Sequence, residues 1–300
     1  LSIVLLQRNF SESLERKKRQ IDYAGTITFS AAIIALLAYV LSGKVTLLVL
    51  FAACLFIFYF IERKAKEPII PFEILTKSNT VVNIISFLTA AVLIGADVYL
   101  PIYIQNILGY RPTVSGPSMA PMSVSWLISS VILAKAIPKY GEKVVIGLST
   151  SIVLLSCLLL PTLGIQSSLF LVVIYTFIMG FGFGGAFTTM TIVIQASVNY
   201  NKRGAATALN SLVRTLGQTI GVSIFGSIFN QNIIKYFNNI GLKGIDPNSL
   251  YSSTGLNSTI SLQNIQLSLN SALHVVFKAL IILTIVCLAL SSILPSGLKE

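Results

Sequence analysis

The chain has 300 residues, of which 54% are hydrophobic and only 10% are charged, and its formal net charge is +11 at pH 7. Ordinary soluble domains carry roughly 25% charged residues, so this composition excludes a water-soluble globular fold. The basic residues lie in short clusters between apolar runs and not on one exposed face with aromatic residues, so the positive charge does not indicate a nucleic-acid partner.

Apolar runs recur along almost the whole chain. A helix needs about 20 apolar residues to cross the hydrocarbon core of a bilayer. The sequence therefore predicts an all-α, polytopic transmembrane helical bundle in contact with the lipid bilayer. The predicted spans, in chain order, are residues 23–41, 45–61, 81–104, 114–134, 144–163, 169–195, 205–229 and 272–294.

Lysine and arginine are concentrated in alternate connecting segments. These include residues 63–66, 135–143 and 202–203. Because basic loops stay on the cytoplasmic side of a membrane, this alternation predicts a multi-pass protein of the cell membrane with both termini in the cytoplasm.

Two segments do not fit the pattern of spans and short loops. Residues 1–20 begin with the apolar hexamer 1–6, which we interpret as the end of a preceding span followed by a cytoplasmic basic linker; a short amphipathic tail is the alternative. Residues 238–270 are rich in Asn, Ser and Gly and nearly uncharged, so they predict a long external loop that is helical in part.

Asp97 is the one acidic residue within a predicted span. A carboxylate inside a membrane costs about 2.5 kcal/mol or more unless it is paired, protonated or wetted. At helical spacing it shares a polar stripe with Asn83, Ser86 and Thr89. Two interpretations stay open: a wetted carboxylate at the membrane rim, or a group that binds a proton or cation.

Arg214 lies about 15 Å into the seventh predicted span, too deep to reach the interface easily. It shares a helix face with Asn210, Gly217 and Gly221. The side chain either hydrogen-bonds carbonyls of a neighbouring helix as a structural contact, or lines a cavity where it attracts an anion or stabilises a gate.

Glycines and prolines interrupt several spans. Glycines let helices approach closely, so close packing is the first interpretation of these positions; a hinge or a substrate-facing surface is the alternative. Proline removes a backbone hydrogen-bond donor and bends a helix. Thr191 and Gln195 share a face with part of the glycine run and can face a cavity. The residues predicted to act in packing or hinge motion are Gly180, Gly182, Gly184, Gly217, Gly221, Pro101 and Pro121.

Signatures of soluble enzymes are missing from the sequence, which has no paired-histidine metal motif, nucleophile elbow or phosphate loop. Cys54, Cys157 and Cys287 all lie in apolar runs and are interpreted as small core residues. We therefore expect no enzyme activity, no catalytic residue, no metal site and no cofactor.

The order of several short motifs resembles the later part of a 14-span drug:proton antiporter of the major facilitator superfamily, the EmrB/QacA type. The resemblance covers nearly the whole chain. The motifs are IDYAG at 21–25, EPIIP at 67–71, LPIYIQ at 100–105, LGY at 108–110, Pro121, the glycine run at 180–185, RGAA at 203–206, RTLG at 214–217 and Gly221.

The resemblance implies that residues 21–66 are the central extra helix pair of that family and that residues 78–296 are its C-terminal six-helix bundle, with the N-terminal six-helix half missing. It also implies export of a drug or another small amphipathic molecule by alternating access, with the proton gradient as the energy source. Candidates for the cavity lining are Asp97, Thr191, Gln195, Asn210 and Arg214.

A basic loop resembles the degenerate C-terminal copy of the cytoplasmic loop motif of this family. Its residues are Lys135, Lys139, Gly141 and Lys143, with Pro138 where the motif has aspartate. The alternatives to drug efflux are an exporter of an endogenous metabolite, lipid or siderophore, and a truncated membrane protein that does not transport.

Overall fold

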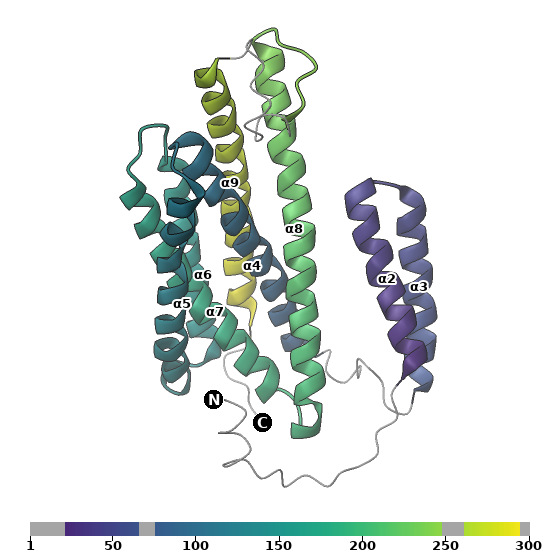
Figure 1. The fold of residues 1–300 in the computed structure, drawn as a ribbon. Coiled ribbons are helices and arrows are strands. Elements are labelled where there is room, and N and C mark those ends of the chain that lie inside the picture. Colours follow the sequence, from purple (N-terminus) through teal and green to yellow (C-terminus); the bar gives the residue numbers. More distant parts are fainter. Residues whose placement is uncertain (1–21, 66–75, 248–260, 295–300) are drawn as a thin grey trace. The chain divides into compact units, whose positions relative to one another are not determined.

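The computed structural model describes residues 22–65, 76–247 and 261–294. Within these residues all regular structure is helical, and eight helices are long and apolar enough to cross a membrane (Figure 1). The predicted fold class is therefore confirmed. The segment predicted at residues 1–20 and the EPIIP motif at 67–71 lie outside the described residues.

The eight long helices follow the predicted spans in order. They are α2 (Tyr23–Ser42), α3 (Val45–Lys64), α4 (Lys77–Ile102), α5 (Pro112–Tyr140), α6 (Glu142–Leu159), α7 (Leu169–Ala196), α8 (Arg203–Asn239) and α9 (Leu262–Ile293). Three short turns adjoin them: the π-helical η2 (Tyr103–Ile107) and the 3-10 turns η3 (Leu160–Thr162) and η4 (Tyr200–Lys202).

Side-chain caps start several of these helices. The hydroxyl oxygens of Thr76, Ser168 and Ser261 accept hydrogen bonds from the first-turn amides of α4, α7 and α9. These amides have no partner inside the helix, so a capping oxygen stabilises the start of the helix.

The last two helices extend beyond the predicted spans. Of the residues 238–270 expected to form a partly helical loop, 238–239 lie in α8 and those from Leu262 onward lie in α9. Apolar residues continue at helical spacing on the inner side of both extensions, where Ile233, Phe237 and Leu269 are fully buried. Polar residues on the outer sides lower the average hydrophobicity, so a search for membrane-length apolar runs stops too early.

The chain divides into two compact units, and the first contains most of α2 and all of α3. Gly43, with φ of 68°, makes the turn between these helices, and the rings of Phe29 and Phe58 pack with their centroids 4.8 Å apart. Glu62 lies in the last turn of α3 and is only 2% exposed. The sequence placed this carboxylate just outside a span, and the structure includes it in the helix.

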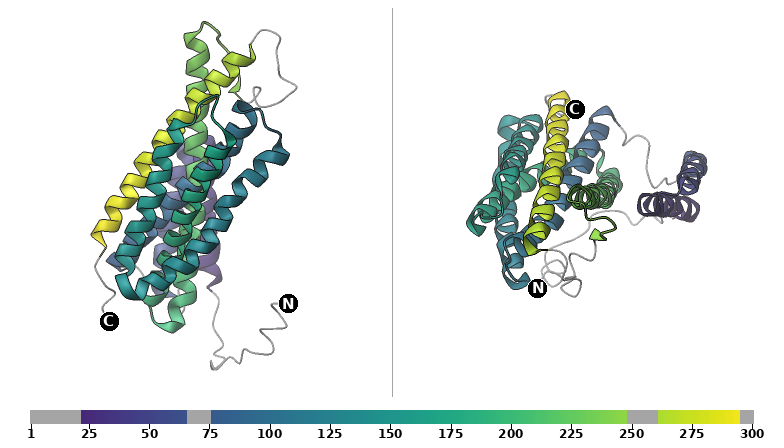
Figure 2. Two further views of the ribbon diagram at one scale, coloured as in Figure 1. Left: turned by 90° about the vertical axis from the view of Figure 1, so that its left-hand side faces the viewer. Right: turned by 90° about the horizontal axis from the view of Figure 1, so that it is seen from above.

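The second unit contains α4 to α9 (Figure 2). The closest partners are α5 with α7, α4 with α8, and α6 with α7. Helix α9 lies alongside α4, α6 and α8, as the view from above in Figure 2 shows. Each helix buries one side against these neighbours, and the apolar core runs through all six.

Glycines on α7 set its distance from two neighbours. A Cβ atom at Gly180 or Gly184 would collide with backbone carbonyl groups of α5, those of Met122 and Trp126 respectively. A Cβ atom at Gly182 would lie 2.8 Å from the backbone nitrogen of Val153 on α6. Helix α7 therefore contacts α5 and α6 backbone to backbone, which is the packing that small residues permit in membranes.

Pro101 changes the helical register at the C-terminal end of α4. The ring has no N–H group, so it cannot donate to the carbonyl of Asp97 four residues earlier. Two residues later the backbone enters η2, where the Leu108 amide bonds to the Tyr103 carbonyl at 3.1 Å. Pro121, in contrast, lies within α5 without ending it.

Candidate functional site

A polar seam joins α7 to α8, and we define it by Thr191, Gln195, Thr207 and Arg214. Nη2 of Arg214 donates to Oγ1 of Thr191 at 2.9 Å and to the Phe187 carbonyl at 3.0 Å. One turn further along, Nε2 of Gln195 donates to Oγ1 of Thr207 at 3.2 Å. Three of the predicted lining residues, Thr191, Gln195 and Arg214, thus meet at this seam.

The guanidinium of Arg214 lies over an aromatic ring but has no carboxylate partner among the described residues. Its central carbon is 4.6 Å from the centroid of the Phe187 ring. Nε is buried without a hydrogen-bond partner, and Nη1, which is not buried, makes no hydrogen bond to the described residues. A cation in a transmembrane segment is costly, and here its charge is not neutralised by the bundle itself.

The Phe187 ring is part of a layered stack that sequence reasoning missed. On α5 the indole of Trp126 stacks against it, with ring centroids 5.3 Å apart and an interplanar angle of 15°. Arg214, Phe187 and Trp126 thus belong to α8, α7 and α5, and we call them the cationic–aromatic stack. Trp126 is the single tryptophan of the chain, and this rarity was the one feature of the sequence that could have drawn attention to it.

Asn210 does not belong to the seam. Its Nδ2 donates to Oδ1 of Asn83 and to Oγ of Ser86, both on α4 and both at 2.9 Å, and the residue is only 2% exposed. The hydroxyl of Ser86 in turn donates to the sulfur of Met190 on α7 at 3.2 Å. The amide of Asn210 is therefore committed to holding α8 against α4.

Glycines complete the contact between α8 and α4. A Cβ atom on Gly217 would collide with the Phe87 carbonyl, and one on Gly221 would come within 2.9 Å of the Ala91 side chain. The helix face that the sequence predicted on α8 is thus divided. Asn210, Gly217 and Gly221 pack on α4, whereas Arg214 reaches α7.

Asp97 lies apart from the other members of its predicted stripe. Asn83, Ser86 and Thr89 are buried within the bundle, and the Thr89 hydroxyl contacts the sulfur of Cys287 at 3.7 Å. The Asp97 side chain is exposed and has neither a hydrogen bond nor an ion pair to a described residue. The carboxylate is available to a proton, a cation or another part of the protein.

The basic loop motif spans the tight connection between α5 and α6. Lys135 and Lys139 lie on the last turns of α5, and Lys143 lies in the first turn of α6. Between the two helices Gly141 adopts φ of 79°, a conformation that favours glycine. Pro138 is contained within α5.

Polar contacts also fix the other end of the bundle. The Tyr103 hydroxyl donates to the Gly164 carbonyl at 2.7 Å, and Nε2 of His274 lies 2.9 Å from the Leu163 carbonyl. Both contacts hold the segment between α6 and α7. Among the described residues, no group of three His, Cys, Asp or Glu side chains is arranged to hold a metal ion.

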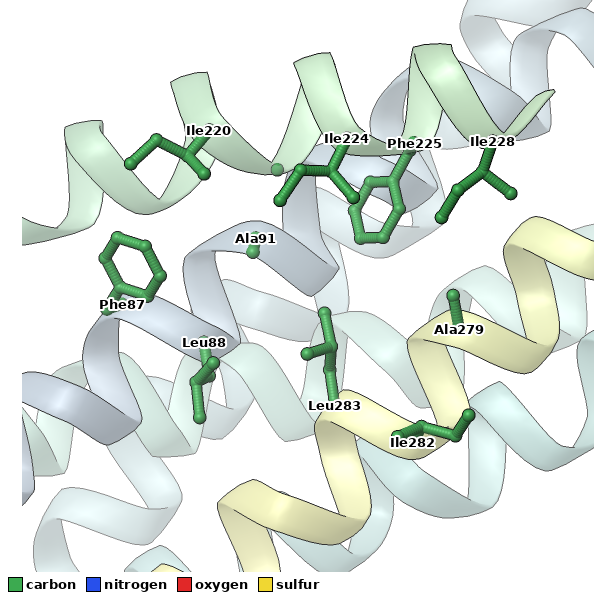
Figure 3. A pocket seen from close by; sticks show the side chains of 11 residues that line it. Phe87, Leu88, Ala91, Ile220, Ile224, Phe225, Ile228, Ala279, Ile282 and Leu283 are labelled. Carbon is green, nitrogen blue, oxygen red and sulfur yellow. The ribbon is translucent and has the colours of Figure 1, made fainter. Parts of the chain in front are cut away.

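An apolar groove of about 320 Å³ lies between α4, α8 and α9 (Figure 3). It has no polar side chain to orient a charged or hydrogen-bonding ligand. The residues that line it are Phe87, Leu88, Ala91, Ile220, Gly221, Ile224, Phe225, Ile228, Ala279, Ile282 and Leu283. The polar seam and Asp97 are therefore the better candidates for specific recognition.

Comparison with known proteins agrees with the fold. The family model of the Major Facilitator Superfamily matches residues 23–222. Multidrug resistance protein 3 of Bacillus subtilis (strain 168) is 30% identical over 257 residues, which cover 81% of this chain and 50% of that protein. Multidrug efflux pump SdrM of Staphylococcus aureus (strain N315) is 28% identical over 236 residues, which cover 76% of this chain and 52% of SdrM.

The fold and the site define a multi-pass membrane protein of the transporter class. The chain belongs to the Major Facilitator Superfamily, as its motifs predicted. It spans about half the length of the curated relatives that it matches.

Proposed function

We propose that this chain is part of a proton-coupled exporter of drugs or other small amphipathic molecules in the cell membrane. Relatives named as multidrug resistance and efflux proteins support the proposal. In the complete transporter, α4 to α9 would face a second six-helix bundle across a central cavity, with both termini in the cytoplasm. No cofactor is required, because the proton gradient supplies the energy.

The observation that carries this proposal is a pair of intramembrane charges without partners. Asp97 on α4 and Arg214 on α8 each lack an ion pair within the described residues. A purely structural bundle gains nothing from two unneutralised charges in its spans, since each destabilises insertion into the membrane. Charges of this kind suit a protein that binds ions or polar groups during its working cycle.

The packing of α8 indicates how the bundle could change shape. Close contacts at Gly217 and Gly221 attach α8 to α4, and close contacts at Gly180 and Gly184 attach α7 to α5. Between these pairs, the seam uses side-chain hydrogen bonds that can be exchanged for bonds to water or substrate. We propose that the seam loosens when the transporter alternates between its two states.

The test is transport in proteoliposomes by the complete transporter that contains this chain, with ethidium as an amphipathic cation. We expect ethidium movement to require a pH gradient and to stop when an ionophore collapses the gradient. Asp97→Asn, which removes the titratable carboxylate, should abolish this dependence. Glu142→Gln, a carboxylate at the start of α6, is the matched control.

Two results would contradict the proposal. Ethidium movement that is equal with and without the gradient rules out proton coupling. A correctly inserted complete transporter that moves no amphipathic compound at all favours a membrane protein without transport activity. An exporter of an endogenous compound would show gradient-dependent movement of that compound and no transport of ethidium.

A further inference from the structure

We propose that the apolar groove between α4, α8 and α9 holds one acyl chain of an anionic phospholipid, whose phosphate is bound by Lys278 and Lys235. The proposal goes beyond the export function and does not depend on it. It assigns a lipid to a part of the bundle that lies apart from the residues of the polar seam.

The groove offers the surface that a hydrocarbon chain requires. Helices α4 and α8 touch at Ala91 and Gly221, where the side chains are small, and the larger side chains of Phe87, Ile224 and Ile282 lie around this contact (Figure 3). A space of about 320 Å³ is left between the three helices. In a bilayer, lipid tails fill such a space, because an empty one would leave the lining atoms without van der Waals partners.

The side of α8 that forms the groove is its apolar side. The exposed polar residue Thr215 precedes Ile224 by nine residues, about two and a half turns, so the two lie on opposite sides of the helix. Ser211 precedes Ile220 by the same number of residues. Ile224 is 50% exposed, and Ile282 across the groove on α9 is 62% exposed. Exposed apolar side chains on the apolar side of a membrane-spanning helix contact lipid, so the groove is open to the bilayer.

Two lysines lie beyond one end of the groove, the end that Ile228 and Ala279 form in Figure 3. On α9, Lys278 is next to Ala279 and about one turn before Ile282. On α8, Lys235 follows Ile228 by seven residues, almost two full turns, so it lies on the same side of the helix about 10 Å further along. A lipid whose chain leaves the groove at this end brings its headgroup toward both lysines.

The two lysines have no partner within the described residues. Both are exposed, and neither makes a hydrogen bond or an ion pair to a described residue. Helices α8 and α9 contain no acidic residue. Asp97 on α4 lies six residues beyond Ala91, which turns it about 120° away from the groove. The positive charge at this end is therefore not neutralised by the helices that form the groove.

The position of Lys278 favours a lipid headgroup as its partner. It lies within the predicted span 272–294, where an ammonium group is costly unless it reaches the membrane surface or binds an anion. The apolar lining itself adds little selectivity, because a lipid tail gains no hydrophobic free energy by moving from the bilayer into the groove. The two charges therefore set the preference, and they favour a headgroup with net negative charge over a zwitterionic one.

The test measures binding of single lipids to the complete transporter that contains this chain, in detergent, by native mass spectrometry. The probes are dioleoylphosphatidylglycerol, which is anionic, and dioleoylphosphatidylcholine, which has the same chains and a zwitterionic headgroup. We expect phosphatidylglycerol to bind more tightly, by about fivefold for each lysine. This factor corresponds to about 1 kcal/mol for a basic residue near anionic lipid.

Variants separate the headgroup contacts from the groove. Lys235→Gln and Lys278→Gln should each weaken binding of phosphatidylglycerol by about fivefold and leave phosphatidylcholine unchanged. Ala279→Leu enlarges a side chain inside the groove and should weaken both lipids. Arg111→Gln is the matched control, because it removes an exposed cation directly before α5, a helix that does not line the groove. It should change neither affinity.

Three results would overturn the proposal. The first is equal binding of the two lipids by the unmodified transporter, and the second is a preference for phosphatidylglycerol that survives replacement of both lysines. The third is unchanged binding of both lipids by Ala279→Leu, which would place the chain outside the groove and leave the groove to a protein helix. If Ala279→Leu also lowers the melting temperature, the lysine variants decide. Ethidium export is measured separately, so none of these results bears on the proposed transport function.

Discussion

Arg214 binds Phe187 in two ways at once: Nη2 donates to the Phe187 carbonyl at 3.0 Å, and the guanidinium lies 4.6 Å from the centroid of the ring of the same residue. A single residue of α7 therefore fixes both the plane and one hydrogen bond of the deepest cation on α8. Lysine offers a point charge in place of a planar group, so it cannot reproduce both contacts.

We expect Arg214→Ala to destabilise the bundle through the loss of these contacts, by about 1.5 to 3 kcal/mol for a hydrogen bond that involves a charged group. The measurement is the apparent melting temperature of the full chain in detergent, with Arg111→Ala as the control for removal of an exposed cation. An unchanged melting temperature in Arg214→Ala would show that the contacts to Phe187 and Thr191 are not maintained in the membrane.

Gly184→Ala should separate α5 from α7. The new methyl group would meet the Trp126 carbonyl and the Ser129 hydroxyl, and neither backbone can move away without losing its own packing. Overpacking of this kind costs about 1 to 3 kcal/mol. Gly116→Ala, on the same α5 helix but with nothing within 4 Å of its Cβ position, is the matched control and should be neutral or slightly stabilising. Equal melting temperatures for the two variants would contradict the observed packing.

Asn210 and Asn83 should be energetically coupled. Asn210→Ala removes the donor to the Asn83 amide, and Asn83→Ala leaves Asn210 bonded to Ser86 alone. The two single variants should therefore each lose stability, while the double variant loses less than their sum. Interhelical hydrogen bonds in membranes contribute about 0.6 kcal/mol on average and up to about 1.7 kcal/mol. A double-mutant cycle measures the coupling, and strict additivity would show that the pair at 2.9 Å makes no net contribution.

Cysteine labelling should distinguish Asp97 from Asn210. Asp97 is exposed, whereas Asn210 is 2% exposed between α4 and α8. In a chain whose half-buried Cys54 is replaced by Ser, we expect a membrane-impermeant maleimide to react quickly with Asp97→Cys and not with Asn210→Cys. Similar reaction rates at the two positions would mean that α4 and α8 are not held together as described.

Gly141→Ala tests the tight turn in the basic loop motif. Nothing lies within 4 Å of the Cβ position, so the effect comes only from the backbone conformation, φ 79° and ψ 159°, which costs a residue with a side chain about 1 to 3 kcal/mol. Gly204→Ala, at an open position inside α8, should lack this penalty. Equal thermal stability of the two variants would argue against the left-handed conformation at Gly141.

The helices could be predicted because a membrane imposes a minimum length on each apolar run. The C-terminal end of α8 and the N-terminal end of α9 could not be predicted, since Phe237 and Leu269 are buried on helices whose other sides are polar. Helical periodicity placed Asn210 and Arg214 one turn apart on α8. It could not show that α8 lies between two neighbours, which directs Asn210 to α4 and Arg214 to α7.

The cationic–aromatic stack shows a second limit of sequence reasoning. Trp126, Phe187 and Arg214 belong to three helices and are far apart along the chain, so no local spacing relates them. Their meeting depends on how closely α5 and α7 approach at Gly184, which only the packed bundle reveals. Side chains on different spans come together only because the helices that carry them pack closely.

The length of α8 has a practical use in structure determination. With 37 residues the helix is about 55 Å long, whereas the hydrocarbon core is about 30 Å thick, so a substantial part of it stands clear of the lipid. In the proposed orientation, the C-terminal end of α8 and the N-terminal end of α9 would together form a rigid protrusion on the outside of the cell. An antibody fragment raised against that protrusion could enlarge the particle for electron cryomicroscopy, and it would leave the transmembrane face untouched.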